Sequence, residues 1–392
     1  MRLAVVTTHP IQYYAPLFRM LSMEEGIELK VFYTWSQSQL GAKYDVDFGK
    51  MIEWDIPLLN GYSFEFVNNV SKDPGVHHFN GIRNPELNRE ITKWEPDYLL
   101  VIGWNFNSHL SCMHYFKGKM PVLFKGDSTL LDEKPGVKRF LRRIFLRWVY
   151  TNIDYALYVG KNNHDYFRKH GMRENQLFWV PHAVDNARFE GSGIYEQEAK
   201  EWRKQLGLEE NDLVVLFAGK LEPRKDPFFF IRLANHLKDP RLKIVLVGNG
   251  MLENEMKREA SGDKRIIFID FQNQQKMPLV YRLGDIFAMP SRSETWGLAI
   301  NEAMACKRPV IASSQCGCTP DLVEEGVTGW VLKPGELGVE KMEMILLQIL
   351  DDRTILDAMG ENAWKKLQAY SYSSVIDKMR KVFTVIDLQT NK

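Results

Sequence analysis

Short apolar runs rich in β-branched residues recur along the chain, and segments of helical length separate them. In the first half these runs lie at residues 3–7, 29–33, 98–103, 122–125 and 155–160. In the second half they lie at residues 213–219, 243–248, 265–270, 285–290 and 309–313. Continuous apolar strands that alternate with helices are typical of parallel sheets covered on both faces. The two series therefore predict two doubly wound α/β domains in tandem.

The strand pattern stops after residues 180–185, where a polar stretch containing Gly191 and Gly193 begins. We therefore expect a first domain at residues 1–187 and a second at residues 188–372. A last helix at about residues 373–392 is expected to pack back on the first domain. Ligands of such sheets bind beyond the carboxyl ends of the strands, so the predicted site lies in a cleft between two facing domains.

Length and composition limit the protein class. A chain of 392 residues is too long for one core and suits two domains. Its 51 basic and 50 acidic residues give a net charge of +1, which offers no general attraction to nucleic acid. Four cysteines are too few for a disulfide framework and fit a reducing compartment. The apolar start is too short for a signal peptide and nothing approaches ~18 apolar residues, so we expect a cytoplasmic protein.

The segment at residues 290–305, PSRSETWGLAINEAMA, carries the clearest chemical signal. Glu294 and Glu302 are eight positions apart, with Gly297 between them where a strand turns into a helix. A helix that begins near Gly297 would direct free N–H groups at a ligand. A diphosphate at the helix start, with a ribose diol on one carboxylate and a sugar on the other, fits this spacing. The alternative is an ordinary strand–turn–helix with two solvated acids.

This segment resembles the E-x7-E motif of the family 4 retaining glycosyltransferases. The resemblance implies the GT-B fold, in which two Rossmann-like domains face each other across a cleft. It implies that Glu302 holds the ribose hydroxyls and that Glu294 faces the donor sugar. Backbone N–H groups at Gly297 and Leu298 would hold the distal phosphate. The first domain would then bind the acceptor, and the second the nucleotide-sugar donor.

A second segment, FAGKLEPRKD at residues 217–226, follows a strand and precedes a helix that opens with Pro227. The family usually has Gly-Arg here and a lysine shortly after. In this chain Gly219 is followed by Lys220 in place of the arginine, and Lys225 matches the lysine. Both cations would contact the diphosphate, although a lysine lacks the bidentate fork of arginine. They could instead be surface charges that flank a turn.

Three weaker features complete the predicted donor site. Gly248, in VGNG at the end of a strand, matches a Gly-x-Gly of the family. Phe271 stands where the nucleobase usually lies, or else belongs to the core. Cys316 and Cys318 have no accompanying histidine that would suggest a metal, so a structural pair is the preferred interpretation.

The acceptor side is less specific. The sequence THPIQYYAP at residues 8–16 resembles a bacterial surface-polysaccharide branch of the family, in which His9, Gln12 and Tyr13 would line the acceptor site. Tyr13 and Tyr14 could instead simply pack. After the strand at 122–125, Asp127 is the candidate carboxylate near the acceptor hydroxyl, and Lys125 could reach a phosphate or a sugar. Capping of a helix by Asp127 or Ser128 is the alternative. Asn107 and His109 are further candidates.

Two other segments have chemical meaning. Residues 134–148 carry six basic residues and no acid, with apolar residues at helical spacing. Such a helix could lie on an anionic membrane, but a domain helix with its apolar stripe in the core is the favoured interpretation. Asp45 and Asp47 form a D-x-D, yet they precede the donor motifs by some 170 residues. We interpret them as part of an acceptor-side loop, and expect no metal and no cofactor.

The resemblance implies a hexosyltransferase that moves a sugar from a UDP- or GDP-sugar to a glycan or lipid-linked acceptor in bacterial cell-envelope polysaccharide synthesis. The reaction would retain configuration by a metal-independent front-face displacement. The residues expected to support it are Asp127, Lys220, Lys225 and Glu294. A GT-B epimerase or phosphorylase and a non-catalytic nucleotide-sugar binding protein remain alternatives. A dinucleotide-dependent oxidoreductase is disfavoured because residues 8–12 lack a Gly-x-Gly-x-x-Gly.

Overall fold

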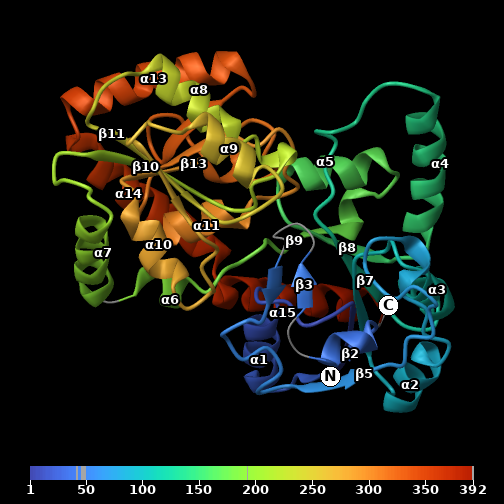
Figure 1. Cartoon of the computed structure of the whole chain (residues 1–392). Coiled ribbons are helices and arrows are strands. Elements are labelled where there is room, and N and C mark those ends of the chain that lie inside the picture. Colours follow the sequence, from blue (N-terminus) through green and yellow to red (C-terminus); the bar gives the residue numbers. More distant parts are fainter. Residues whose placement is uncertain (41–42, 46–49, 192, 391–392) are drawn as a thin grey trace. The chain divides into compact units, whose positions relative to one another are not determined.

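The computed structural model describes residues 1–40, 43–45, 50–191 and 193–390, and the chain forms two compact units (Figure 1). Unit 1 contains Met1–Lys43, Ile56–His182 and Tyr372–Lys392, and unit 2 contains Tyr44–Asp55 and Ala183–Ser371. The division at His182 falls slightly before the predicted boundary, and the last helix belongs to unit 1. The assignment of residues 44–55 to unit 2 was not predicted. That the two units face each other across a cleft stays a prediction.

Unit 1 is built on a seven-stranded parallel sheet with the strand order β5-β2-β1-β6-β7-β8-β9. The order reverses between β1 and β6, which makes this the point where ligands of a doubly wound sheet bind. Apolar side chains of the inner strands form the core with the covering helices. The strands are β1 (Arg2–Thr7), β2 (Glu28–Tyr33), β5 (Ser63–Phe66), β6 (Tyr98–Ile102), β7 (Val122–Lys125), β8 (Tyr155–Tyr158) and β9 (Leu177–Trp179).

Helices cover both faces of this sheet, and α15 (red in Figure 1) packs beside α1. The helices of unit 1 are α1 (Ala15–Met23), α2 (Leu87–Trp94), α3 (Asn107–Phe116), α4 (Val137–Thr151), α5 (Lys161–Lys169) and α15 (Tyr372–Thr390). A two-stranded sheet pairs β3 (Lys43–Asp45) with β4 (Lys50–Ile52).

Unit 2 is built on a six-stranded parallel sheet with the order β12-β11-β10-β13-β14-β15. Its order reverses between β10 and β13, so the loops after these strands flank the ligand-binding edge. The strands are β10 (Leu213–Ala218), β11 (Leu242–Val247), β12 (Ile266–Ile269), β13 (Ile286–Met289), β14 (Val310–Ser313) and β15 (Gly329–Leu332).

The sheet of unit 2 lies between α8 and α13 on one side and α10, α11 and α14 on the other (Figure 1). Its core combines the apolar strand residues with the inward faces of these helices. The helices are α6 (Asn186–Glu190), α7 (Gly193–Gln205), α8 (Phe228–His236), α9 (Glu253–Glu259), α10 (Met277–Leu283), α11 (Leu298–Ala305), α12 (Thr319–Leu322), α13 (Glu336–Asp351) and α14 (Thr354–Leu367).

The favoured interpretation of residues 134–148 is wrong. In α4 the buried residues are Leu146, Val149 and Tyr150 near its C-terminal end, whereas the other apolar side chains are exposed. The stripe that we expected in the core therefore faces solvent. Within the part of the chain that the structure describes, every helix is too short or too polar to cross a bilayer.

Candidate functional site

The helix predicted at the second-domain motif begins where expected. Gly297 is the N-terminal cap of α11, with a φ of 105°, a conformation that side chains other than glycine rarely adopt. The N–H groups at the start of a helix lack the carbonyl partner four residues earlier that interior N–H groups have, and the helix dipole makes this end positive. In α11 the N–H of Ile300 instead donates to Gly297 O at 2.9 Å. The loop after β13 thus presents Gly297 and Leu298 at the edge where the strand order of unit 2 reverses.

Backbone hydrogen bonds hold this loop against two neighbouring loops. Arg292 donates its N–H to the carbonyl of Arg224 at 2.8 Å, in the loop that follows β10. Glu294 donates its N–H to Gln315 O at 3.1 Å and accepts from Gly317 N at 2.9 Å, in the loop that follows β14. The loop after β14 therefore fixes the backbone of Glu294, and the loop after β10 holds the same segment at Arg292.

Two of the four predicted catalytic residues, Lys225 and Glu294, contact each other. Lys225 Nζ donates a hydrogen bond to Glu294 Oε2, and the side chains are only 17% and 12% exposed. A neighbouring cluster of charges was not predicted. Its centre is Asp226, a buried carboxylate that pairs with Arg232 at 3.0 Å and with Arg292 at 3.2 Å. Lys220 lies partly buried directly after Gly219, at the end of β10.

Glu302 lies deeper than a solvated carboxylate would. It is 3% exposed on α11, and the hydroxyl of Tyr281 on α10 donates to its Oε2 at 2.6 Å. The interpretation of the two glutamates as solvated acids therefore fails for both residues. Tyr281 carried no signal in the sequence, because a tyrosine in a helical segment resembles any other core residue.

Gly248 has a packing function that explains its identity. Its φ is +133°, and a Cβ there would lie 2.1 Å from the carbonyl oxygen of Gly219. The N–H of Gly219 donates to Val247 O at 2.9 Å, and that of Leu221 to Asn249 O at 3.0 Å. The loops after β10 and β11 thus approach backbone to backbone, which sets the position of the loop that carries Lys220.

Phe271 is partly buried in the loop after β12, outside the core of unit 2. Its N–H donates to Asn249 Oδ1 at 2.9 Å, and the ring of Trp54 stands edge-on with centroids 6.5 Å apart. Asn273 also donates to the carbonyl of Glu53 at 2.6 Å. Residues 53–55 therefore contact the predicted nucleobase region, which corrects the assignment of this loop to the acceptor side.

The D-x-D motif itself can be followed only in part. Asp45 ends β3, whereas residues 46–49, and with them Asp47, lie outside the described residues.

In unit 1, the predicted residues after β1 lie beside the strand-order reversal between β1 and β6. His9 Nδ1 is 2.9 Å from Thr8 Oγ1, and its ring stands edge-on to Trp35 with centroids 5.5 Å apart. Gln12 and Tyr13 are partly buried, and the carbonyl of Tyr13 accepts from the hydroxyl of Tyr372 at 3.1 Å.

A second cluster forms after β7. Asp127 Oδ2 lies 3.7 Å from His182 Nε2, and Lys125 Nζ donates to the carbonyl of Val180. Burial lowers the pKa of Lys125 to about 7, while the negative charge of Asp127 opposes this shift. Burial also lowers the pKa of His182. It raises the pKa of Tyr14, and the negative charge of Asp127 raises that pKa further.

His182 and Tyr14 were not predicted, because residues far apart in sequence build this cluster. The capping alternative for Asp127 and Ser128 fails, since the next helix, α4, begins only at Val137 with Gly136 as its cap.

His109 is placed differently from the prediction. It is fully buried in α3, with Nε2 2.9 Å from Thr34 Oγ1 and Nδ1 2.7 Å from the carbonyl of Gly103. Burial lowers its pKa to about 4, so the ring is neutral. Both ring nitrogens are engaged, and the residue ties α3 to its neighbours instead of facing a ligand. Asn107 is partly buried at the start of the same helix, 3.5 Å from Asn80 Oδ1.

The cysteines fit the structural interpretation. All four are free and buried. Burial raises the pKa of Cys316 to about 12 and moves that of Cys318 in the same direction. Neutral thiols are poor metal ligands and poor nucleophiles, so this pair serves packing.

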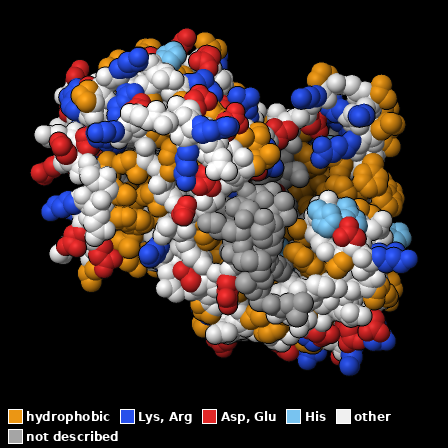
Figure 2. Space-filling model, in the orientation of Figure 1, with side chains coloured by type: hydrophobic (Ala, Val, Ile, Leu, Met, Phe, Trp, Pro, Cys, Tyr) orange, Lys and Arg blue, Asp and Glu red, His pale blue; other side chains and the backbone are white. Residues whose placement is uncertain are grey.

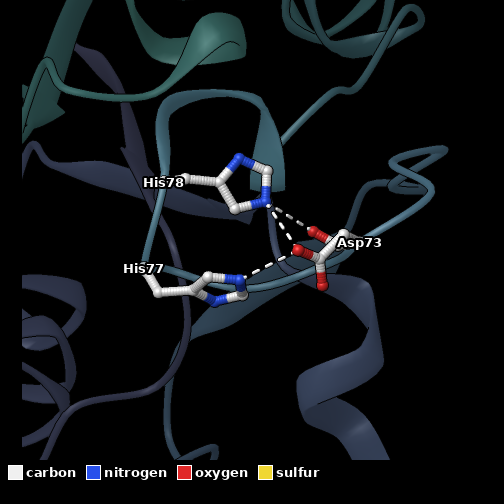
Figure 3. A group of neighbouring side chains, drawn as sticks. All are labelled: Asp73, His77 and His78. Carbon is white, nitrogen blue, oxygen red and sulfur yellow. Dashed lines mark hydrogen bonds and ion pairs between the residues drawn. The ribbon is translucent and has the colours of Figure 1, made fainter.

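One group with metal-binding chemistry escaped the sequence analysis. In unit 1, the Nε2 atoms of His77 and His78 lie 3.1 and 3.2 Å from Asp73 Oδ2 (Figure 3). Two imidazoles and one carboxylate are a donor set that zinc accepts. On this exposed loop, however, His77 Nε2 already hydrogen-bonds to the Asp73 carboxylate at 3.1 Å and His78 Nε2 to the Asp73 carbonyl oxygen at 3.0 Å. These contacts with Asp73 account for the arrangement.

Comparison with known proteins gives the group to which the second unit is similar. Residues 198–366 match the family described as "Glycosyl transferases group 1". The UDP-Gal:alpha-D-GlcNAc-diphosphoundecaprenol alpha-1,3-galactosyltransferase of Escherichia coli is 28% identical over 222 residues, 54% of each chain. The chain thus spans about half the length of this curated relative.

Two solved structures resemble the whole chain. The Anabaena protein Alr3699/HepE in complex with UDP and glucose superposes with a TM-score of 0.71 at 17% identity, covering 98% of this chain and 100% of that chain. WaaG, a glycosyltransferase involved in lipopolysaccharide biosynthesis, superposes with a TM-score of 0.67 at 15% identity, covering 97% and 99%. These likenesses show the fold, two Rossmann-like domains of the GT-B type.

Proposed function

We propose that the protein transfers a hexose from a nucleotide-diphosphate sugar to a glycan or lipid-linked acceptor, because residues 198–366 match the family described as glycosyl transferases group 1. The reaction serves bacterial cell-envelope polysaccharide synthesis, retains the configuration of the sugar and needs no metal. A uridine donor is favoured over a guanosine donor. In support, the E. coli relative is named for UDP-Gal, and the similar Anabaena structure holds UDP and glucose.

The observation that carries this proposal is the Lys225–Glu294 pair beside the start of α11. The two charges satisfy each other in a largely enclosed position. A diphosphate at the α11 terminus would compete for Lys225, and the separated Glu294 could then accept hydrogen bonds from sugar hydroxyls. The ion pair would therefore hold both side chains close to where the donor binds, with the lysine available to the diphosphate and the glutamate available to the sugar.

Catalysis in this scheme depends on charge stabilisation and positioning. The bond between the sugar and the diphosphate breaks as negative charge grows on the phosphate oxygens. Lys220, Lys225 and the first-turn N–H groups of α11 would stabilise that charge, which is the largest effect available to such a site. The departing phosphate would accept the proton of the attacking hydroxyl on the same face of the sugar.

We propose that the acceptor binds unit 1. The cluster of Lys125, Asp127 and His182 combines a carboxylate with nitrogen donors at the carboxyl end of β7, where a hydroxyl and a phosphate could both bind. The acceptor in the name of the E. coli relative is a lipid diphosphate. A lipid-linked acceptor would place the protein at the cytoplasmic face of a membrane.

Lys225→Ala tests the donor site. Loss of a charge-assisted contact worth about 1.5–3 kcal/mol predicts a fall in kcat/KM of roughly ten- to a hundredfold for the donor. Lys366→Ala removes a lysine from another Lys–Glu pair, with Glu324, on the surface of the same unit and should act as wild type. Both variants should keep the far-ultraviolet spectrum and melting temperature of a folded protein. Wild-type turnover in Lys225→Ala would remove this lysine from the mechanism.

The same assay separates the alternatives. Incubation with UDP- and GDP-sugars, with and without acceptor glycans, should release nucleoside diphosphate and give a product of retained configuration by nuclear magnetic resonance. A binding protein would show a thermal shift with nucleotides but no turnover. An epimerase would convert its nucleotide sugar without an acceptor. A phosphorylase would transfer the glycosyl group to inorganic phosphate and would release a sugar phosphate in place of a nucleoside diphosphate.

A further inference from the structure

The exposed face of α4 is unusual for a helix of a globular unit. Its first nine residues, Val137–Phe145, contain no buried side chain, and the buried Leu146, Val149 and Tyr150 anchor only its C-terminal part. The exposed apolar side chains range from 42% to 75% exposure. They are Val137, Phe140, Leu141, Ile144, Phe145 and Trp148.

These side chains share one face. At 3.6 residues per turn they fall within an arc of roughly 140°, opposite the residues that anchor the helix. Cations border the arc on both sides, with Lys138 and Arg142 next to Phe145, and Arg147 next to Phe140 in projection. All three cations are exposed. Figure 2 shows orange side chains interspersed with blue ones over α4.

The apolar surface extends beyond α4 to two other segments of unit 1. The ring of Trp104 stands edge-on to Phe145 with centroids 5.7 Å apart, and Phe145 lies 5.7 Å from Trp148. Val76 and Phe79 are 41% and 39% exposed, and they line an open pocket of about 650 Å³ with these aromatic residues. We call α4 with Val76, Phe79 and Trp104 the apolar–basic surface.

We propose that the apolar–basic surface docks unit 1 on an anionic lipid bilayer. An exposed helix with bulky apolar residues on one face and cations at its borders matches a bilayer surface, where apolar side chains enter the acyl region and cations meet lipid phosphates. Tryptophan is suited to this boundary because its ring is apolar and its N–H can remain hydrated. Burying these side chains in protein would need a partner that also neutralises the cations.

Charge separates this occupant from a second copy of the chain. Two identical surfaces in a symmetric dimer would bring cations of like sign together, which costs free energy. An anionic bilayer supplies the complementary charge. The inference deepens the proposed function by naming the membrane to which a lipid-linked acceptor would bring the enzyme, but the binding itself requires no turnover.

Vesicle flotation with the full chain tests the proposal. Anionic vesicles of phosphatidylcholine with about 30 mol% phosphatidylglycerol are compared with vesicles of pure phosphatidylcholine. We expect at least about tenfold more protein on the anionic vesicles, with weaker binding at about 0.5 M salt because the charges are screened. Equal binding to both vesicle types, or none, overturns the proposal.

Two triple variants make the test specific. Phe140→Ser with Leu141→Ser and Ile144→Ser removes exposed apolar groups and should reduce vesicle binding about tenfold or more. Leu337→Ser with Met344→Ser and Leu347→Ser removes exposed apolar groups from α13 of unit 2 and should leave it unchanged. Equal binding of the two variants would contradict the proposal, as would light scattering that shows a dimer dissociated by the first variant. Release of nucleoside diphosphate from a soluble donor should be the same in all three proteins, which separates this result from a failure of the proposed function.

Discussion

At the scale of single residues, the loops that form the candidate donor site depend on a backbone approach that only glycine permits. The N–H of Gly219 bonds to the strand beside it, and Gly248 leaves no room for a Cβ against the Gly219 carbonyl. The position of Lys220 therefore depends on a residue that carries no functional group. The sequence pattern marks Gly248 as a motif residue, but glycine is required there because of a backbone contact with a residue 29 positions away, Gly219.

Gly248→Ala should be strongly destabilising. The Cβ would clash with the Gly219 carbonyl oxygen, and the φ of +133° is unfavourable for alanine, so a loss of roughly 2–4 kcal/mol in the free energy of unfolding is expected. Gly262 also has a positive φ, +91°, but an added Cβ would meet open space there. Gly262→Ala should therefore lower the free energy of unfolding by only about 1 kcal/mol. Urea unfolding of both variants measures the difference. Equal losses would mean that strain in φ alone, and not the clash, decides the effect.

Lys125 should make stability depend on pH. Burial lowers its pKa from 10.5 to about 7, so between these values the unfolded chain binds a proton that the folded protein lacks. The free energy of unfolding then rises with pH in this window, by at most about 1.4 kcal/mol per pH unit. Wild type should gain stability over Lys125→Met from pH 7 to pH 9.5 in urea titrations. The exposed Lys169→Met should not reproduce this trend, and a parallel course of wild type and Lys125→Met would refute it.

At the scale of elements, the sequence predicted the interior of both sheets well. Each of the ten apolar runs coincides with a strand. Nine of these are interior strands, which are buried on both faces and must be apolar throughout, and the tenth, β12, is an edge strand. Of the strands that were missed, β5, β9 and β15 lie at edges of the two large sheets, and β3 and β4 form the small two-stranded sheet. Edge strands are short and partly solvated, so their composition resembles that of loops. Helix α4 was misassigned because periodicity shows that a face is apolar but not what covers it.

Helix α15 should be essential to unit 1. Its inward face contains seven buried side chains, each worth about 1.5–3 kcal/mol on burial, against a typical domain stability of about 5–15 kcal/mol. They are Tyr372, Val375, Ile376, Met379, Val382, Phe383 and Ile386. The side chains of Tyr98 and Tyr155 also donate to Asp387 and Gln389 of this helix.

Truncation after residue 371 should therefore unfold unit 1 and spare unit 2. Limited proteolysis with mass spectrometry should show rapid cleavage within residues 56–182, while residues 183–371 persist. Removal of residues 391–392 alone is the control and should give the wild-type pattern. Equal resistance of both units after truncation would show that α15 is dispensable.

At the scale of the whole molecule, the motifs predicted the residues of the candidate donor site but not their contacts. The spacing of Glu294 and Glu302 indicated a helix start, which the structure places at Leu298. The contact between Lys225 and Glu294 joins positions 69 residues apart and could not follow from local pattern. Burial was likewise invisible in the sequence, which is why His109 was taken for a ligand contact and His182 was overlooked.

The chain crosses between the units at four points, after residues 43, 55, 182 and 371. A ribosome that has translated residues 1–182 has synthesised every strand of the first sheet, but not the helix that covers it. Unit 2, all of whose residues precede α15, can be complete before unit 1 is. During synthesis the apolar surface of the N-terminal unit stays uncovered until α15 is made. Domains usually fold in order from the N-terminus along a nascent chain, and here that order is reversed. Chaperone dependence should accordingly fall on the half that emerges first.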